Sequence, residues 1–285
     1  MKNPYIKQDL ELVLIIIIFA VLQAVLIEAT AAVTALTEAS GPFAVAFEAC
    51  VGQPKVIAIS TALSSILTAL IFIRAHWTVI DKTFMQRKPW VALVWTVFCT
   101  LGVLLPLETF DEGLNTLFQG WFGSRPFDMP ADYEKLFAGL MKEPWGYIAV
   151  GVVGPIAEEV VFRGAILQKL LEIWDGKKHW IAIAVSALIF AAVHGNLAQG
   201  INAFIIGLLL GWMYWRTRSL IPGLIVHFIT NTTSYVIFNL LPAARDGELI
   251  DLFNGSTRTL GAAVIFSLCI FLPSLYQLYR GLKRS

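Results

Sequence analysis

The chain has 285 residues, of which 57% are hydrophobic and only 14% are charged, and its formal net charge is +1. Because soluble proteins carry roughly 25% charged residues, this composition argues against a soluble domain and predicts an integral membrane protein. The nearly neutral balance also argues against a nucleic-acid partner, which requires a basic face. The three cysteines lie far apart without metal-ligand spacing, and we interpret them as small apolar residues.

Eight apolar segments are long enough, or nearly so, to cross a membrane, which takes roughly 20 helical residues. They are residues 10–36, 55–75, 89–107, 146–170, 180–196, 200–216, 219–241 and 259–280. The first segment exceeds the ~7–15 residues of a signal-peptide core, so we interpret it as a retained span. The predicted fold class is an all-α integral membrane protein of about eight transmembrane helices around a polar cavity, in a single domain over residues 1–285.

The fifth and sixth segments are short, and the connection between them, residues 195–199, is brief enough for a tight helical hairpin. The sixth segment contains Gly207-Leu-Leu-Leu-Gly211, a GxxxG pattern that favours close packing between helices. We interpret Asn202 in the same segment as a hydrogen-bonding contact to another helix.

Lysine and arginine are unevenly divided between the two sides of the predicted bundle. The chain ends and loops on one side carry 14 of these residues, and the opposite loops carry 6. The positive-inside rule therefore predicts that both termini are cytoplasmic. The expected location is the cytoplasmic membrane of a prokaryote or the endoplasmic reticulum of a eukaryote. The longest connection, residues 108–143, is interpreted either as an interface-lying amphipathic segment or as a plain extracytoplasmic loop.

The fourth apolar segment contains three charged residues, Glu158, Glu159 and Arg163, within six positions. An ionisable side chain at mid-membrane is unfavourable by at least ~2.5–3.5 kcal/mol and indicates a functional site by default. Glu159 and Arg163 have i, i+4 spacing with the acid first, which is the favourable order for a helical ion pair. This pairing would leave Glu158 free for chemistry.

Three further polar residues, His194, His227 and Asn231, lie in the later apolar segments. With a rise of ~1.5 Å per residue, Glu158 and these three residues fall in one depth band near the membrane centre. His227 and Asn231 have i, i+4 spacing and share a helix face. Each residue alone is compatible with a hydrogen bond between helices, whereas together they predict one buried polar site.

The residue types in this predicted site fit the hydrolysis of an amide. A carboxylate in a low-dielectric cavity can act as a general base near neutral pH, and a nearby histidine can position the attacking water. A second histidine and an asparagine amide can donate hydrogen bonds to a developing oxyanion. The sequence contains no HExxH, Gly-x-Ser-x-Gly or Walker A motif, which argues against a zinc helix, a serine hydrolase elbow and an ATP-driven pump.

Three motifs follow one another along the hydrophobic segments. They are Glu158-Glu159-Val-Val-Phe-Arg163, Phe190-Ala-Ala-Val-His194 and His227-Phe-Ile-Thr-Asn231. The pattern EExxxR, FxxxH, HxxxN resembles the CAAX-protease and bacteriocin-processing (CPBP) family of intramembrane endopeptidases, which includes the eukaryotic CAAX prenyl endopeptidase. The resemblance covers roughly residues 146–240, which we take as the catalytic core.

The resemblance implies an eight-span helical fold with a water-accessible cavity. It implies that Glu158 and His194 activate the water and that His227 and Asn231 form the oxyanion site. Three residues would support this site: Glu159, Arg163 and Phe190. The implied reaction is hydrolysis of a peptide bond near the C-terminus of a prenylated (CAAX-type) or other hydrophobic peptide within the lipid bilayer.

Cofactor use is open between two mechanisms. Glu158, His194 and His227 could hold a zinc ion, since two histidines and one carboxylate form a catalytic zinc set. What is known of the family favours a metal-free glutamate mechanism, so we expect no cofactor.

Two other functions also fit the polar residues. The chain could be a non-catalytic membrane immunity or scaffold protein of the same fold. It could also be a proton-coupled transporter, because buried Glu, His and Arg form proton relays, although the sequence shows no inverted repeat. The substrate and the oligomeric state cannot be read from the sequence.

Overall fold

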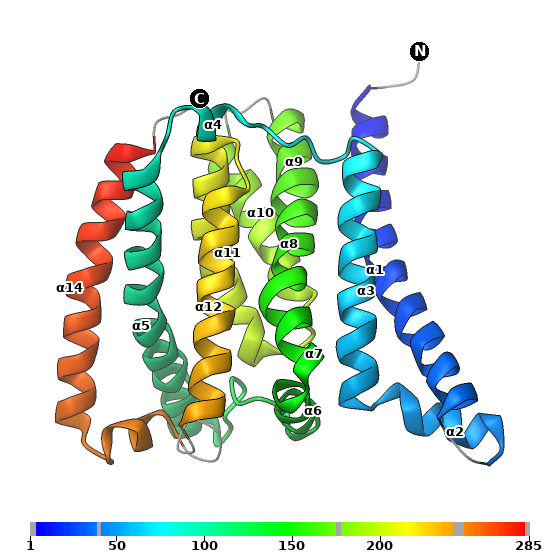
Figure 1. Cartoon of the computed structure of the whole chain (residues 1–285). Coiled ribbons are helices and arrows are strands. Elements are labelled where there is room, and N and C mark those ends of the chain that lie inside the picture. The colour runs from blue at the N-terminus through cyan, green and yellow to red at the C-terminus, as the bar shows by residue number, and fades with distance from the viewer. Residues whose placement is uncertain (1–3, 39–40, 175–177, 242–247, 283–285) are drawn as a thin grey trace. The chain divides into compact units, whose positions relative to one another are not determined.

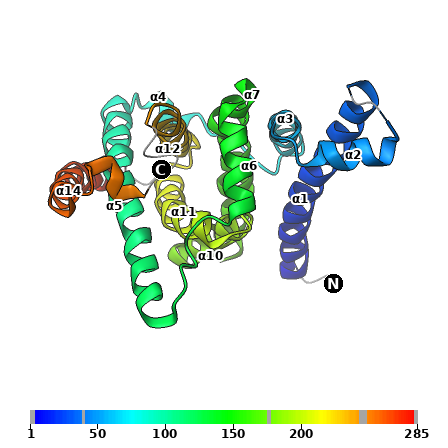
Figure 2. The same ribbon diagram turned by 90° about the horizontal axis from the view of Figure 1, so that it is seen from below.

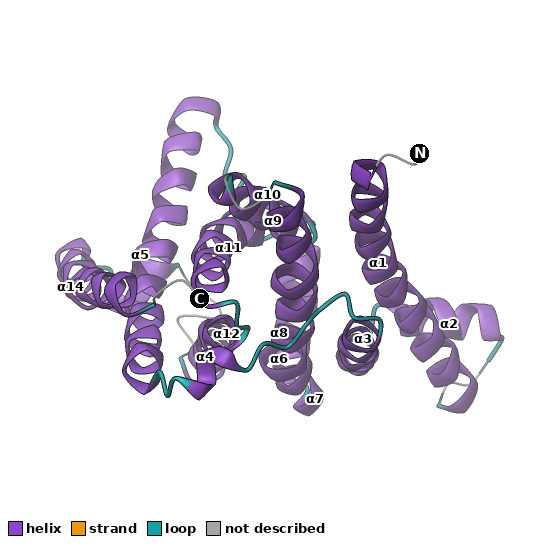
Figure 3. Ribbon diagram, turned by 90° about the horizontal axis from the view of Figure 1, so that it is seen from above, coloured by secondary structure: helices purple, strands orange, loops and turns teal. Residues whose placement is uncertain are grey.

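The computed structural model describes residues 4–38, 41–174, 178–241 and 248–282. Within these ranges every regular element is a helix, and Figure 3 shows no strand. Six helical segments there are long and apolar enough to cross a membrane: Leu10–Thr37, Pro54–Arg74, Trp90–Phe122, Leu197–Thr217, Ile221–Leu240 and Thr257–Gly281. The predicted all-α, multi-pass membrane protein is therefore confirmed.

The predicted number of eight spans stays a prediction. The fifth predicted span forms a shorter helix, α10 (His179–Ala192). The fourth predicted span lies in a continuous helical run, residues 144–173, that changes its helix type four times. These two segments are helical, but neither is among the six long apolar helices of the described residues.

The chain divides into two compact units. Unit 1 comprises Met1–Ile80 and Ala131–Ala182, and unit 2 comprises Asp81–Pro130 and Ile183–Ser285. The predicted single domain over residues 1–285 stays a prediction.

Unit 1 places the helical run that contains the EExxxR motif against two long helices. Its elements are α1 (Pro4–Thr37), α2 (Phe43–Val51), α3 (Pro54–Arg74), α6 (Ala131–Lys142), α7 (Pro144–Tyr147), η1 (Ile148–Val153), α8 (Gly154–Glu158), η2 (Glu159–Leu167) and α9 (Gln168–Ile173). Helices α1 and α3 lie side by side (Figure 1). Small side chains on α3 allow this approach, and the Ser64 hydroxyl donates a 2.6 Å hydrogen bond to Gln23 Oε1 on α1.

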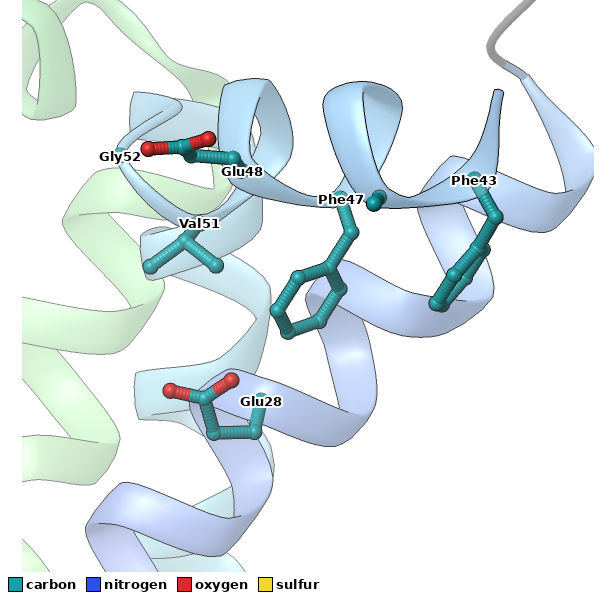
Figure 4. A pocket seen from close by; sticks show the side chains of 7 residues that line it. Glu28, Phe43, Phe47, Glu48, Val51 and Gly52 are labelled. Carbon is teal, nitrogen blue, oxygen red and sulfur yellow. The ribbon is translucent and has the colours of Figure 1, made fainter. Parts of the chain in front are cut away.

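An open cavity of about 520 Å³ lies between α1 and α2 in unit 1. Figure 4 shows that Glu28 of α1 and Phe47 of α2 point toward it from opposite sides. Next to it, small residues of the first helices form a local core: Ala31, Ala35, Ala46, Cys50 and Val56.

Unit 2 is built on a long helix pair. Its elements are α4 (Thr83–Gln86), α5 (Trp90–Phe122), most of α10, α11 (Leu197–Thr217), α12 (Ile221–Leu240), η3 (Leu249–Phe253) and α14 (Thr257–Gly281). Helix α14 lies along α5, as Figures 1 and 2 both show. The backbones approach closely at Gly102, where a Cβ atom would lie only 2.6 Å from the Phe271 nitrogen.

Of the two interpretations of residues 108–143, the plain loop is wrong for most of the segment, because two helices occupy it. Helix α5 continues to Phe122 and is 33 residues long, and a second helix, α6, occupies Ala131–Lys142. The acidic residues that suggested a loop have partners in the folded chain. Arg125 pairs with Glu112 at 2.9 Å, and the buried Asp111 accepts a hydrogen bond from Asn202 on α11. The predicted interhelical role of Asn202 is thereby confirmed.

Candidate active site

The EExxxR motif forms a buried ion pair in unit 1. Glu159 and Arg163 are each only 1% exposed, and Arg163 Nη1 lies 2.8 Å from Glu159 Oε1. Glu158, one residue earlier, is half-buried. The ion pair that the i, i+4 spacing predicts is therefore confirmed.

The helix type around this motif differs from the regular α-helix that the sequence suggests. Glu158 is the last residue of α8, and Glu159 begins the π-helix η2. Pro155 has no N–H to donate, and the π-helix η1 ends just before it, which matches the local adjustment that proline induces in membrane helices. Most π-turns are single and many occur at functional sites, so a nine-residue π-segment at these acids is notable.

The π-geometry changes which residues share a face with Arg163. Hydrogen bonds in a π-helix join residues five apart rather than four apart, and Glu158 precedes Arg163 by five positions. The charge of Glu158 accordingly acts on Arg163 together with that of Glu159. The interpretation that Glu158 is available for chemistry stays a prediction, with the added observation that its charge also acts on Arg163.

Neighbouring elements of unit 1 hold this π-helix in place. Its Phe162 packs edge-on against Phe19 of α1, with ring centroids 5.6 Å apart. Just beyond its end, Lys169 forms a 2.8 Å ion pair with Glu11 of α1. These contacts fix the motif laterally against the first membrane helix.

The FxxxH motif lies at the end of α10 in unit 2. The predicted span 180–196 placed His194 inside a helix. Helix α10 ends at Ala192 instead, so His194 lies in the turn before α11. Gly195 adopts a left-handed φ of 73°, a conformation that commonly stops a helix. The turn is short, and the predicted tight hairpin is confirmed.

The tautomer of His194 follows from the hydrogen bond that its ring makes with the backbone. Its Nδ1 lies 2.8 Å from the Phe190 carbonyl oxygen. Because a carbonyl oxygen only accepts, Nδ1 carries the proton, and Nε2 of the neutral ring presents a lone pair. That nitrogen can accept a hydrogen bond from a water molecule.

Phe190 contacts both predicted histidines of unit 2. Its ring centroid lies 5.0 Å from that of His194 and 5.7 Å from that of His227, and both ring pairs are nearly perpendicular. Phe190 is 2% exposed and His227 is 7% exposed. The structure therefore brings these three residues together, which gives the phenylalanine of FxxxH a physical role as the packing surface for two imidazoles.

Asn231 follows His227 by one turn of α12. Helix α12 is regular from Ile221 to Leu240, so the i, i+4 pair shares a face as expected. Asn231 is half-buried, and its amide can donate hydrogen bonds. Its role in an oxyanion site stays a prediction.

The residues that sequence analysis assigned to one site are divided between the two units. Glu158, Glu159 and Arg163 belong to unit 1, whereas Phe190, His194, His227 and Asn231 belong to unit 2. Among the described residues, no group of three His, Cys, Asp or Glu side chains is arranged to hold a metal ion. The zinc set Glu158, His194 and His227 is divided between the two units, and the use of a metal stays a prediction.

Sequence analysis missed several groups that shape these motifs. It gave no role to Thr78, whose hydroxyl bonds to the main chain of η2, and none to Asp111, the partner of Asn202. No local sequence signal identifies either residue, because each contact joins segments more than 80 positions apart.

Comparison with known proteins bears on the segment that carries all three motifs. Residues 141–233 match the family model for Rce1-like type II CAAX prenyl endopeptidases. The predicted resemblance to the CPBP family is confirmed over this segment. Members of this family are membrane proteases, in agreement with the multi-pass helical fold.

Two bacterial proteins are similar to part of the chain. The chain is 34% identical over 111 residues to the membrane-embedded CAAX protease MroQ of Staphylococcus aureus, a match covering 38% of this chain and 44% of that protein. It is 31% identical over 103 residues to the putative membrane peptidase YdiL of Bacillus subtilis, covering 36% of this chain and 40% of that one. The chain thus spans less than half the length of these relatives. No solved structure matches it.

Proposed function

We propose that this protein is an intramembrane endopeptidase that hydrolyses a peptide bond near the C-terminus of a prenylated, CAAX-type or other hydrophobic peptide. The observation that carries the proposal is the family match over residues 141–233, which contains the three motifs in order. The proposal is supported by the buried Glu159–Arg163 pair and by the two imidazoles that pack on Phe190.

The proposed mechanism uses Glu158 as the general base toward a water molecule. Nε2 of His194 accepts a hydrogen bond from that water and orients it, while its Nδ1–H stays bonded to the Phe190 carbonyl. The water oxygen adds to the carbonyl carbon, and one water proton passes to Glu158. The carbon–nitrogen bond then breaks, and the proton passes from Glu158 to the leaving amine.

The developing negative charge needs donors on the carbonyl oxygen. We assign these to His227 and Asn231, whose N–H groups lie on one face of α12. Glu159 neutralises Arg163 and acts only through it. The proposal requires residues from both units to act on the same substrate.

The test is mass spectrometry of a farnesylated CAAX peptide incubated with the detergent-purified protein. Wild type is compared with Glu158→Gln and with the control Glu48→Gln, an exposed glutamate of the same unit. We expect wild type and the control to release the terminal tripeptide. Loss of a general base should slow Glu158→Gln by about 10²–10⁴-fold. Wild-type turnover by Glu158→Gln would contradict the proposal.

Two further arms separate the remaining alternatives. Full activity in the presence of a chelator is expected for the metal-free mechanism, and loss that added zinc restores would contradict it. If the prenylated peptide stays intact, the same peptide without its prenyl group and a hydrophobic transmembrane peptide are tested. No cleavage of any of the three would favour the non-catalytic function.

A further inference from the structure

A threonine far from the motifs in sequence contacts the main chain between Glu159 and Arg163. Thr78 lies in the connection that follows α3 and is 2% exposed. Its hydroxyl donates a 2.6 Å hydrogen bond to the carbonyl oxygen of Val160, 82 positions away. Both residues belong to unit 1, so the contact lies within one compact unit.

The residue after the motif leaves room for this threonine. A Cβ atom on Gly164 would lie 2.3 Å from Thr78 Cγ2 and 2.8 Å from Thr78 Oγ1. Any side chain at position 164 would therefore push Thr78 away from η2. The glycine and the hydrogen bond are two separate observations that indicate the same close approach.

The end of α3 fixes the position of Thr78. His76 adopts a left-handed φ of 57°, which turns the chain at the end of the helix. The N–H groups of Trp77 and Thr78 then both bond to the Phe72 carbonyl, at 3.0 and 3.3 Å. The Trp77 ring packs edge-on against the fully buried Phe72 ring, with centroids 5.1 Å apart. The turn that carries Thr78 is thus held in place by these hydrogen bonds and by the ring contact.

A π-helix of this length needs support from outside the helix. Its hydrogen bonds are less favourable than those of an α-helix, and most π-segments in proteins are single turns. A carbonyl oxygen has two lone pairs, so Val160 can accept the threonine hydroxyl in addition to a helical N–H. The external bond therefore anchors η2, Glu159–Leu167, in the turn where the motif begins.

We propose that Thr78 is a positioning residue that holds the π-register of the EExxxR motif and so directs Glu158. The register matters because the five-residue spacing between Glu158 and Arg163 brings them to one face only in a π-turn. In an α-helical register, Glu158 would rotate away from its present direction. The inference rests on the proposed function insofar as Glu158 is the base.

The test compares three purified variants. Thr78→Val keeps the shape and removes the hydroxyl, whereas Thr78→Ser keeps the hydroxyl. Thr68→Val is the matched control, since Thr68 is a fully buried threonine of α3 whose hydroxyl has no hydrogen-bond partner among the described residues. Each variant is measured for kcat and KM on a cleaved peptide and for hydrogen exchange of the η2 amides.

We expect Thr78→Val to lower kcat by about 10–100-fold with little change in KM, because small misplacements of a catalytic group have effects of that size. The η2 amides should exchange faster in this variant. Thr78→Ser should restore both kcat and protection, and Thr68→Val should match wild type. The inference would be overturned if Thr78→Ser were as impaired as Thr78→Val. It would also be overturned if Thr78→Val left both kcat and amide exchange unchanged.

The two readouts separate this inference from the proposed protease function. If the wild type cleaves none of the peptides, the proposed function fails, whereas faster exchange in Thr78→Val alone still shows that the hydroxyl holds η2. If the wild type cleaves and Thr78→Val shows normal exchange and normal kcat, the protease proposal stands and the role of Thr78 is wrong.

Discussion

At the residue scale, the buried ion pair of the EExxxR motif is the most demanding feature of the chain. Removing two charges from water is unfavourable by several kcal/mol per ion, and only good geometry and further hydrogen bonds offset this. Glu159 and Arg163 meet the geometric condition at 2.8 Å, and Glu158 adds a second negative charge near the guanidinium. Arg163 of this pair thus also interacts electrostatically with Glu158, the acid that we propose as the general base.

Breaking this pair should destabilise the fold, because Arg163 would keep a buried charge without its direct partner. We expect Glu159→Gln to lower the free energy of unfolding by about 3–5 kcal/mol. The matched control is Glu112→Gln, which breaks a partly exposed pair with Arg125 and should change stability by less than about 1 kcal/mol. Thermal unfolding in detergent measures both, and equal shifts would contradict the prediction.

At the scale of elements, the α10–α11 hairpin positions the FxxxH motif. Glycines on α11 allow the helices to touch, as the GxxxG pattern predicts. A Cβ atom at Gly207 would lie 3.0 Å from Ala187 Cβ, and one at Gly211 would lie 2.9 Å from Ile183 Cγ2. The Gly207 position also lies 3.5 Å from the Phe190 ring, so this packing holds the ring that contacts both histidines.

A branched side chain in this interface should therefore separate the helices. We expect Gly207→Val to destabilise the protein by about 1–3 kcal/mol, the usual effect of overpacking, and to reduce the proposed proteolytic activity through Phe190. The control is Gly261→Val on α14, where a Cβ atom meets nothing within 4 Å and the change should stay within about 0.5 kcal/mol. Thermal unfolding of the two variants checks the difference, and a tolerant Gly207→Val would show that the hairpin does not depend on this contact.

At the scale of the whole molecule, the distribution of basic residues predicts how the chain is inserted. The positive-inside rule places both termini in the cytoplasm and the connection between α5 and α6 on the opposite side.

Reporter fusions test this orientation directly. We expect a fluorescent protein fused to the C-terminus to be active and a periplasmic phosphatase at the same point to be inactive. A phosphatase fused after Ser124, between α5 and α6, should be active. The reverse pattern would show that the arginine and lysine distribution does not decide the topology of this chain.

The class of the fold and the order of the motifs follow from the amino-acid sequence alone. In a bilayer each spanning segment must satisfy its own backbone hydrogen bonds, so an apolar run of sufficient length forms a helix whatever its neighbours are. The Glu159–Arg163 pair and the GxxxG contact were also predictable, because both depend on spacing along a single helix. The predicted end of the third span, at residue 107, was too early, since hydropathy does not register that Asp111 and Glu112 of α5 have partners elsewhere.

The helix register and the surroundings of the motif residues depend on tertiary contacts. The π-helix at Glu159–Leu167, the end of α10 before His194 and the bond from Thr78 to Val160 have no local sequence signature. Each depends on a group that reaches the motif from a distant part of the chain or on a turn that the pattern of apolar residues does not specify. A spacing rule assumes one helix type, whereas packing against neighbours selects the register that the folded chain adopts.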